Sequence, residues 1–85
     1  MNNYIKILSF NSKYITGQVY GTIKKDDLVE LYDTLKNPLG IYSHIESISL
    51  FGLDYETLEH GCSADFTCPG LDESILDVGM RLVVD

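Results

Sequence analysis

The sequence predicts an α+β fold: a small antiparallel sheet of about five strands, in the order β-β-α-β-(α)-β-β, with one main helix packed on one face. Several stretches alternate apolar and polar residues with the two-residue period of a strand, and one stretch repeats apolar residues at helical spacing. A chain of 85 residues has room for one modest core, so residues 1–85 are expected to form a single domain.

Five stretches alternate apolar and polar residues or are rich in strand-forming residues. They are predicted to be strands over residues 4–10, 14–23, 43–51, 62–68 and 78–84. Turn-forming residues at 11–13 separate the first two, which are therefore expected to form a hairpin. The third stretch has no clean period, and its assignment depends on its Ile and Ser content and on Gly52 behind it.

Residues 24–36 have the helical pattern, because apolar residues recur there at i, i+3, i+4 and i+7. These residues are Leu28, Leu31, Tyr32 and Leu35. Asp27 and Glu30 resemble a capping box at the start of the helix, and Asn37-Pro38 would end it. This stretch predicts the one main helix.

Two shorter stretches are open to more than one interpretation. Residues 54–61 suit a short helix, with Asp54 as N-cap and Gly61 just beyond its end, or the first arm of another hairpin. We expect the helix. Residues 72–76 are expected to form a single helical turn.

Composition restricts the classes of function. The chain is 45% hydrophobic and 22% charged, which favours a folded protein. No apolar run approaches the roughly 18 residues of a membrane span, and residues 1–4 do not resemble a secretory leader, so a cytoplasmic protein with no membrane partner is expected. A pI near 4.5 argues against direct binding of nucleic acid and favours a basic protein partner.

One group of residues has metal-ligand chemistry. It consists of His60, Cys62 and Cys68, with His44 as a fourth candidate. The spacing matches no standard zinc motif, and both cysteines lie on the apolar face of the predicted strand 62–68. We therefore expect core thiols and no cofactor. A zinc-dependent minidomain and, in an exported protein, a Cys62–Cys68 disulfide are the alternatives.

No pattern of catalytic residues is present in the sequence. It has no nucleophile elbow, Gly-rich phosphate loop or His-Glu-x-x-His motif. Paired carboxylates such as Glu56 and Glu59 have the right chemistry for acid–base catalysis, but a chain of this size offers little concave volume in which to separate their pKa values. We expect no enzymatic activity.

The charge is distributed very unevenly. The segment from Asp54 to Asp85 has eight acidic residues and one basic residue, and so carries all of the net charge of −7. Apolar and aromatic residues interrupt the acids in this segment. Carboxylates spaced along a small scaffold can mimic nucleic-acid phosphates and complement a basic groove, while a few apolar side chains hold the complex.

These observations predict a small acidic inhibitor or neutraliser of a basic, nucleic-acid-binding protein. Phage anti-defence proteins such as anti-CRISPRs, and immunity or antitoxin proteins, share this size and charge, an analogy of class with no motif behind it. The predicted partner-binding residues are Asp54, Tyr55, Glu56, Glu59, Asp65, Asp72, Glu73 and Asp77. Tyr14 and Tyr20 are second-rank contact residues.

The main alternative is a structural module that pairs with itself through an exposed strand edge, in which the acids only confer solubility. Either a monomer or a homodimer is compatible with the sequence.

Overall fold

The computed structural model describes residues 3–85, and within this range the protein is entirely β, which overturns the expected α+β fold. No helix occurs there, so none could cross a membrane. The strands are β1 (Tyr4–Phe10), β2 (Ile15–Tyr20), β3 (Ile23–Lys24), β4 (Leu28–Tyr32), β5 (Pro38–His44), β6 (Ser47–Leu50), β7 (Leu53–Asp54), β8 (Thr57–Leu58), β9 (Ser63–Thr67) and β10 (Arg81–Val84).

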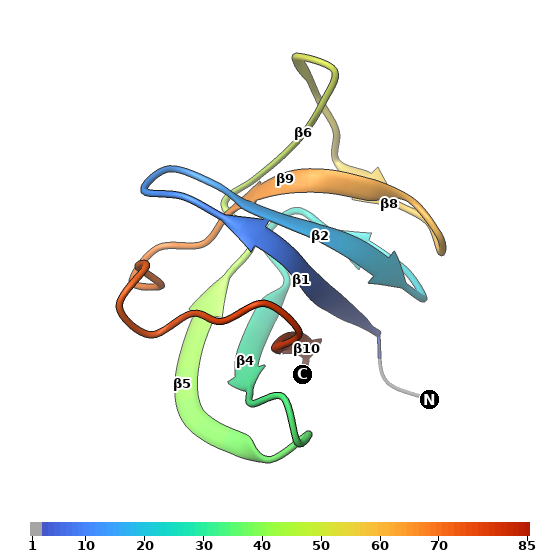
Figure 1. Cartoon of the computed structure of the whole chain (residues 1–85). Coiled ribbons are helices and arrows are strands. Elements are labelled where there is room, and N and C mark those ends of the chain that lie inside the picture. Colours follow the sequence, from blue (N-terminus) through green and yellow to red (C-terminus); the bar gives the residue numbers. More distant parts are fainter. Residues whose placement is uncertain (1–2) are drawn as a thin grey trace.

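Eight strands form one curled antiparallel sheet in the order β5-β4-β10-β1-β2-β9-β6-β7, and β3 and β8 form a two-stranded ribbon (Figure 1). The curl is set by a bent segment in which β5 continues through Ile45 and Glu46 into β6. The Ile45 N–H donates to the Asp27 carbonyl at 2.9 Å, and the Glu46 N–H donates to the Thr67 carbonyl at 2.8 Å. This segment therefore pairs first with the residues before β4 and then with the end of β9, and so links the two sides of the curled sheet at one corner.

Three of the predicted strands are confirmed over most of their length, and the predicted strand 14–23 ends earlier, at Tyr20. β1 and β2 form the expected hairpin, and β9 lies within the predicted strand 62–68. β10 begins at Arg81, three residues later than expected. The predicted strand 43–51 is in fact the end of β5, the bend and β6, and the bend explains why no single period fits it.

The main helix predicted over residues 24–36 is wrong. Residues 24–27 form a turn, in which the Lys24 N–H donates to the Asp27 carboxylate at 2.8 Å and the Asp27 N–H donates to the Lys24 carbonyl at 3.1 Å. Beyond the turn, Val29 and Leu31 are fully buried while Leu28 is 62% exposed. The buried residues are thus two apart, as in a strand. Of the leucines whose spacing suggested a helix, only Leu31 is fully buried.

A second turn follows β4, where the predicted helix was to end. The Asp33 carboxylate accepts hydrogen bonds from the backbone N–H groups of Asn37 and Leu35, both at 2.9 Å, and these bonds lower the pKa of Asp33. The short helix predicted over residues 54–61 is also wrong, since β7 and β8 lie there; β8 pairs with β3 and not with the strand that follows it, so the alternative of a further hairpin is not found either. Residues 72–76 form a turn with one backbone hydrogen bond, from the Ile75 N–H to the Asp72 carbonyl, and no helix.

The core lies inside the curl. Its largest fully buried side chains are Phe66, Ile5, Ile7, Ile23, Leu31, Ile45, Ile48, Leu82, Val19 and Val29. The irregular segment 69–80 crosses one side of the sheet in Figure 1 and adds Leu76 and Met80 to this core. Packing is close at Gly17 of β2, where an added Cβ would lie 2.2 Å from Ile5 Cγ2. The molecule is compact, with a Cα radius of gyration of 11.2 Å.

Candidate functional site: an apolar hairpin tip beside an acidic row

The β6–β7 hairpin projects from the rest of the molecule (Figure 1). Its strands pair Ser49 with Asp54 and Leu50 with Leu53, so its turn consists of Phe51 and Gly52 alone. Both turn residues have positive φ, 53° and 76°. This is the geometry of a type I′ turn, which matches the twist of a two-residue hairpin. Glycine suits such a position, whereas phenylalanine is unusual there.

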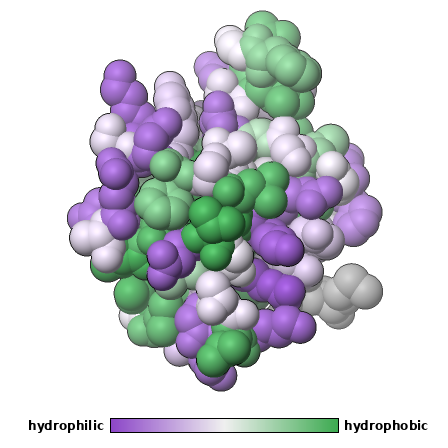
Figure 2. Space-filling model, viewed as in Figure 1, coloured by the Kyte–Doolittle hydropathy of each residue, from purple (hydrophilic) through white to green (hydrophobic). Residues whose placement is uncertain are grey.

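The hairpin tip is the most exposed apolar feature of the described residues. Phe51 is 93% exposed and Leu53 is 62% exposed, while Leu50 packs partly against the core. We call Leu50, Phe51 and Leu53 the apolar tip. In the same orientation, Figure 2 shows a projecting apolar group where the hairpin stands. A left-handed conformation costs a residue with a side chain about 1–2 kcal/mol, so the tip combines strain with exposure, a combination that marks functional sites.

A polar row runs across four strands next to the apolar tip. Direct cross-strand pairs link Thr16 of β2 to Asp65 of β9, Asp65 to Ser49 of β6, and Ser49 to Asp54 of β7. Directly opposite residues in a sheet share one face. We call these four residues the acidic row. Two carboxylates from distant parts of the sequence therefore stand on the same outer face, with one serine between them.

A groove of about 240 Å³ lies where β2, β9 and β6 meet the start of the hairpin turn. It is lined by Thr16, Ser49, Leu50, Phe51, Ser63, Ala64 and Asp65. The Thr16 hydroxyl donates to Asp65 Oδ1 at 2.6 Å and so fixes the orientation of this half-buried carboxylate. The groove is apolar on the side of the tip and acidic on the side of the sheet.

The other predicted partner-binding residues on this side of the molecule follow the hairpin along the chain. Tyr55, 36% exposed, donates its backbone N–H to the Ile48 carbonyl. Glu56 accepts the Lys25 N–H through its carbonyl, which brings a lysine backbone beside the acidic segment. Glu59 lies at the far end of β8, where its carboxylate accepts from the Thr22 hydroxyl at 3.1 Å.

The remaining three acids lie elsewhere. Asp72, Glu73 and Asp77 belong to the segment 69–80, at the left of Figure 1, whereas β8 is at the right. The Asp72 carboxylate accepts from the Ser74 hydroxyl and, at 2.9 Å, from the Ser74 N–H; these bonds lower its pKa. The structure thus brings Asp54 and Asp65 together, with Tyr55 and Glu56 following, and separates the acids of 69–80 from them.

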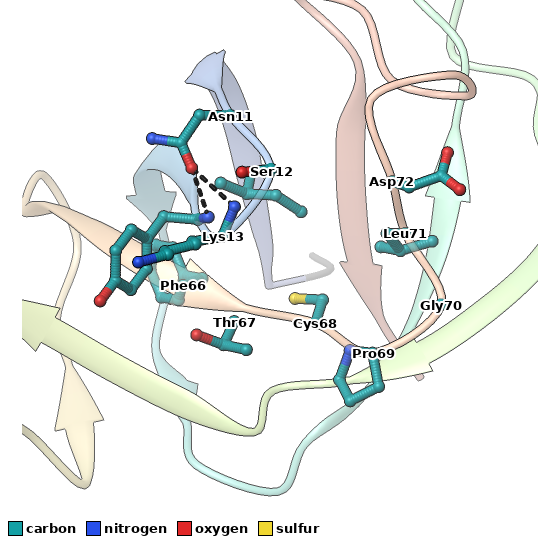
Figure 3. A pocket seen from close by; sticks show the side chains of 12 residues that line it. Asn11, Ser12, Lys13, Phe66, Thr67, Cys68, Pro69, Gly70, Leu71 and Asp72 are labelled. Carbon is teal, nitrogen blue, oxygen red and sulfur yellow. Dashed lines mark hydrogen bonds between the residues drawn. The ribbon is translucent and has the colours of Figure 1, made fainter.

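A second cavity, of about 300 Å³, lies between the β1–β2 turn and residues 66–72 (Figure 3). Lys13 and Asp72 line it, and Cys68 is the one thiol at its wall. Burial, together with the charge of Glu46, raises the pKa of Cys68 to about 12. The thiol therefore stays protonated near neutral pH, and this cavity has no activated nucleophile.

The cysteines flank β9, one at each end and six residues apart. An extended strand advances about 3.3 Å per residue, so the two positions are about 20 Å apart. A Cys62–Cys68 disulfide and a zinc ion shared by both thiols are excluded by this separation, and both thiols are free. Within residues 3–85, no three His, Cys, Asp or Glu side chains are grouped in a way that suits a metal ion.

The second-rank tyrosines differ. Tyr20 stacks on Tyr4 with ring centroids 4.7 Å apart, and Arg81 covers Tyr4 at 4.6 Å. His60 meets the Tyr20 ring edge-on at 5.6 Å. These contacts occupy the Tyr20 ring and favour the view that it covers the sheet face. Tyr14, in the turn before β2, is 40% exposed.

Sequence reasoning missed the apolar tip. Its signal was a Phe-Gly pair between two leucines, which is a two-residue hairpin loop when read with the apolar positions on either side. No protein-family model matches the chain, and no curated protein matches it in sequence, so the case for a function comes from the geometry of this site.

Proposed function

We propose that this protein acts by binding another protein, as an inhibitor or neutraliser of a basic, nucleic-acid-binding partner in the cytoplasm, and that it has no catalytic role. The observation that supports this most is the pairing of an almost fully exposed Phe51 in a strained turn with the acidic row that adjoins it. Exposed apolar side chains that gather at one projecting point, as Phe51 and Leu53 do, are typical of an interaction surface.

The two parts of the site have different physical roles. A phenylalanine buries about 150–250 Å² in a contact, and aromatic side chains in apolar pockets dominate the energy of protein interfaces. Asp54 and Asp65 contribute mainly to recognition, because exposed charges steer association and reject partners of like charge more than they add affinity. The partner that fits has an apolar pocket beside lysine or arginine side chains.

The fit to a nucleic-acid-binding protein depends on charge. Asp54 and Asp65 are two strands apart, or about 10 Å, on one outer face, which gives fixed negative charges at an interval. A net charge of −7 draws the molecule toward any surface built to hold phosphates. Anti-CRISPR, immunity and antitoxin proteins share this size and charge, and the proposal is made by analogy with that class.

The test is capture of partners from a bacterial lysate at low salt, followed by a salt gradient and mass spectrometry. Wild-type protein is expected to retain one basic nucleic-acid-handling protein, and the Asp54→Lys, Glu56→Lys double variant is expected to lose it. The matched control reverses two acids of the distant segment, Asp72→Lys and Glu73→Lys, and should keep the partner. Retention by a folded Asp54→Lys, Glu56→Lys variant would contradict the proposal.

A second candidate function is self-assembly through β5, which ends the strand order and so offers an open edge. Tyr42 on this strand is 63% exposed, and Leu28 on the adjacent β4 is 62% exposed. Light scattering distinguishes the two functions. A stable homo-oligomer whose mass is independent of salt would favour self-assembly.

A further inference from the structure

The groove between the apolar tip and the sheet has the chemistry of a site for one positively charged side chain. Asp65 is half-buried at its wall, and the hydrogen bond from Thr16 uses only Oδ1. The remaining capacity of the carboxylate is left for another donor, since an ionised carboxylate accepts at both oxygens. Hydroxyl oxygens of Ser49 and Ser63 line the same groove and can also accept.

Phe51 and the strand position of Leu50 also line the groove. An aromatic ring attracts a cation placed over its face, and an apolar wall suits the aliphatic stem of a long basic side chain. Phe51 is thus both the exposed residue of the hairpin turn and a lining residue of the groove.

The charge around the groove has one sign. None of its lining residues is basic, and Asp54 continues the acidic row on the same face beyond Ser49. Lys6 of β1, the strand next to β2, is paired with Gln18 and not with Thr16. No cation of the described residues 3–85 lines the groove, so Asp65 has no local counter-charge in it.

We propose that this groove binds an arginine side chain of the partner, with the guanidinium stacked against Phe51 and hydrogen-bonded to Asp65. The inference rests on the proposed function and names the side chain of the partner that this groove binds. Arginine fits better than lysine, because its planar fork can stack on a ring and donate to several oxygens at once, whereas lysine presents a point charge. The groove, at about 240 Å³, lies below the usual range for drug-sized ligands and suits a single side chain.

The test is a titration of the whole protein with N-acetyl-arginine amide at low salt, followed by the backbone amide signals in NMR spectra. We expect saturable shifts at residues 16, 49–51 and 63–65. Asp65→Asn, which keeps the shape of the side chain and an oxygen for the Thr16 hydroxyl, should weaken binding at least fivefold. Phe51→Gly should weaken it too, and Asp72→Asn, remote from the groove, should leave it unchanged.

Two further probes define the chemistry. N-acetyl-citrulline amide has nearly the same shape without the charge, and N-acetyl-lysine amide has the charge without the planar fork. Binding of arginine at least fivefold tighter than either supports the proposal. Equal binding of citrulline overturns it, and so do arginine shifts that spread over all acidic segments or survive Asp65→Asn.

The result separates this inference from the proposed function. If the groove does not take arginine while the lysate partner still depends on Asp54 and Glu56, only the arginine site is wrong. If the groove takes arginine specifically while no salt-sensitive partner is retained by the wild-type protein, the arginine site stands and the inhibitor function is wrong.

Discussion

The β1–β2 and β6–β7 hairpins belong to the same sheet and differ in what their turns are built from. In the first, the Asn11 side chain accepts hydrogen bonds from the N–H groups of Lys13 and Tyr14, both at 2.8 Å (Figure 3). In the second, Phe51 occupies a left-handed position and is 93% exposed. The first turn follows local preferences and supports fold stability, whereas the second departs from them, as residues selected for function often do.

The largest expected contrast is in cysteine reactivity. Cys68 lies beneath the turn of the first hairpin, and its pKa is raised to about 12. At pH 8.5 its thiolate form is therefore about a thousandfold less populated than that of a thiol with the ordinary pKa of 9.0. Iodoacetamide should therefore modify Cys62 long before Cys68, as followed by mass spectrometry. Equal rates in folded protein would show that the core beneath this hairpin is open.

The same thiol gives a pH dependence of stability. Because folding raises the pKa of Cys68, its contribution to stability is complete below pH 9 and is lost as the pH rises toward 12. Urea midpoints measured between pH 8 and 11 should fall less in Cys68→Ala than in wild type. Each protein is compared with itself across the pH series, because the cavity left by Cys68→Ala lowers the urea midpoint equally at pH 8 and at pH 11.

A core substitution in the first hairpin should affect stability far more than one at the apolar tip. Ile7 is fully buried, so Ile7→Ala should cost about 2–5 kcal/mol of unfolding free energy. Leu53→Ala, at a 62% exposed position, should change it by no more than about 0.5 kcal/mol. Urea denaturation of the pair measures both values. A similar cost at Leu53 would mean that the tip is structural.

Replacing Phe51 should separate stability from binding. Phe51→Gly relieves the left-handed strain of about 1–2 kcal/mol and gains chain entropy on unfolding of about 0.5–1 kcal/mol, so stability should stay equal or rise slightly. Partner binding should fall at least tenfold, because the central aromatic group of the contact is lost. Denaturation and affinity are measured on one preparation, and unchanged affinity would remove the apolar tip from the site.

The smallest expected effect is at the first turn. Asn11→Ala removes the acceptor of two exposed hydrogen bonds and should lower stability by about 0.5–1.5 kcal/mol, with partner binding unchanged. Thermal denaturation measures the loss. A change in affinity instead would assign this turn to the binding surface.

The sequence predicts the fold best where a strand has one buried face and no bend. Ile5 and Ile7 in β1, and Ala64 and Phe66 in β9, are buried two residues apart, and these strands were identified correctly. The helix over 24–36 failed because Leu28, Leu31 and Leu35 fit a helical spacing by coincidence, while the buried pair is Val29 and Leu31. Propensity is a weak prior, and here cross-strand pairing with β5 and β10 prevails.

The candidate site was predicted only in part. Asp54 and Asp65 were identified from the charge of their segment, but their common face depends on the pairing of β6 with β7 and β9, which the sequence does not reveal. Phe51 was assigned to the end of a strand, so its apolar character indicated burial. Its exposure follows from the projection of the hairpin beyond the core.

The bent segment that joins β5 to β6 separates the buried core from the exposed β6–β7 turn, where the sequence can change. Ile45 of this segment and Ile48 of β6 are buried in the core, and the residues from Phe51 to Glu56 are all exposed. Substitutions in the hairpin can therefore accumulate at little cost to folding, as they do in the loops of other rigid scaffolds. Under the proposed function, substitutions in these six residues would change the partner that is bound, while the sheet beneath them stays the same.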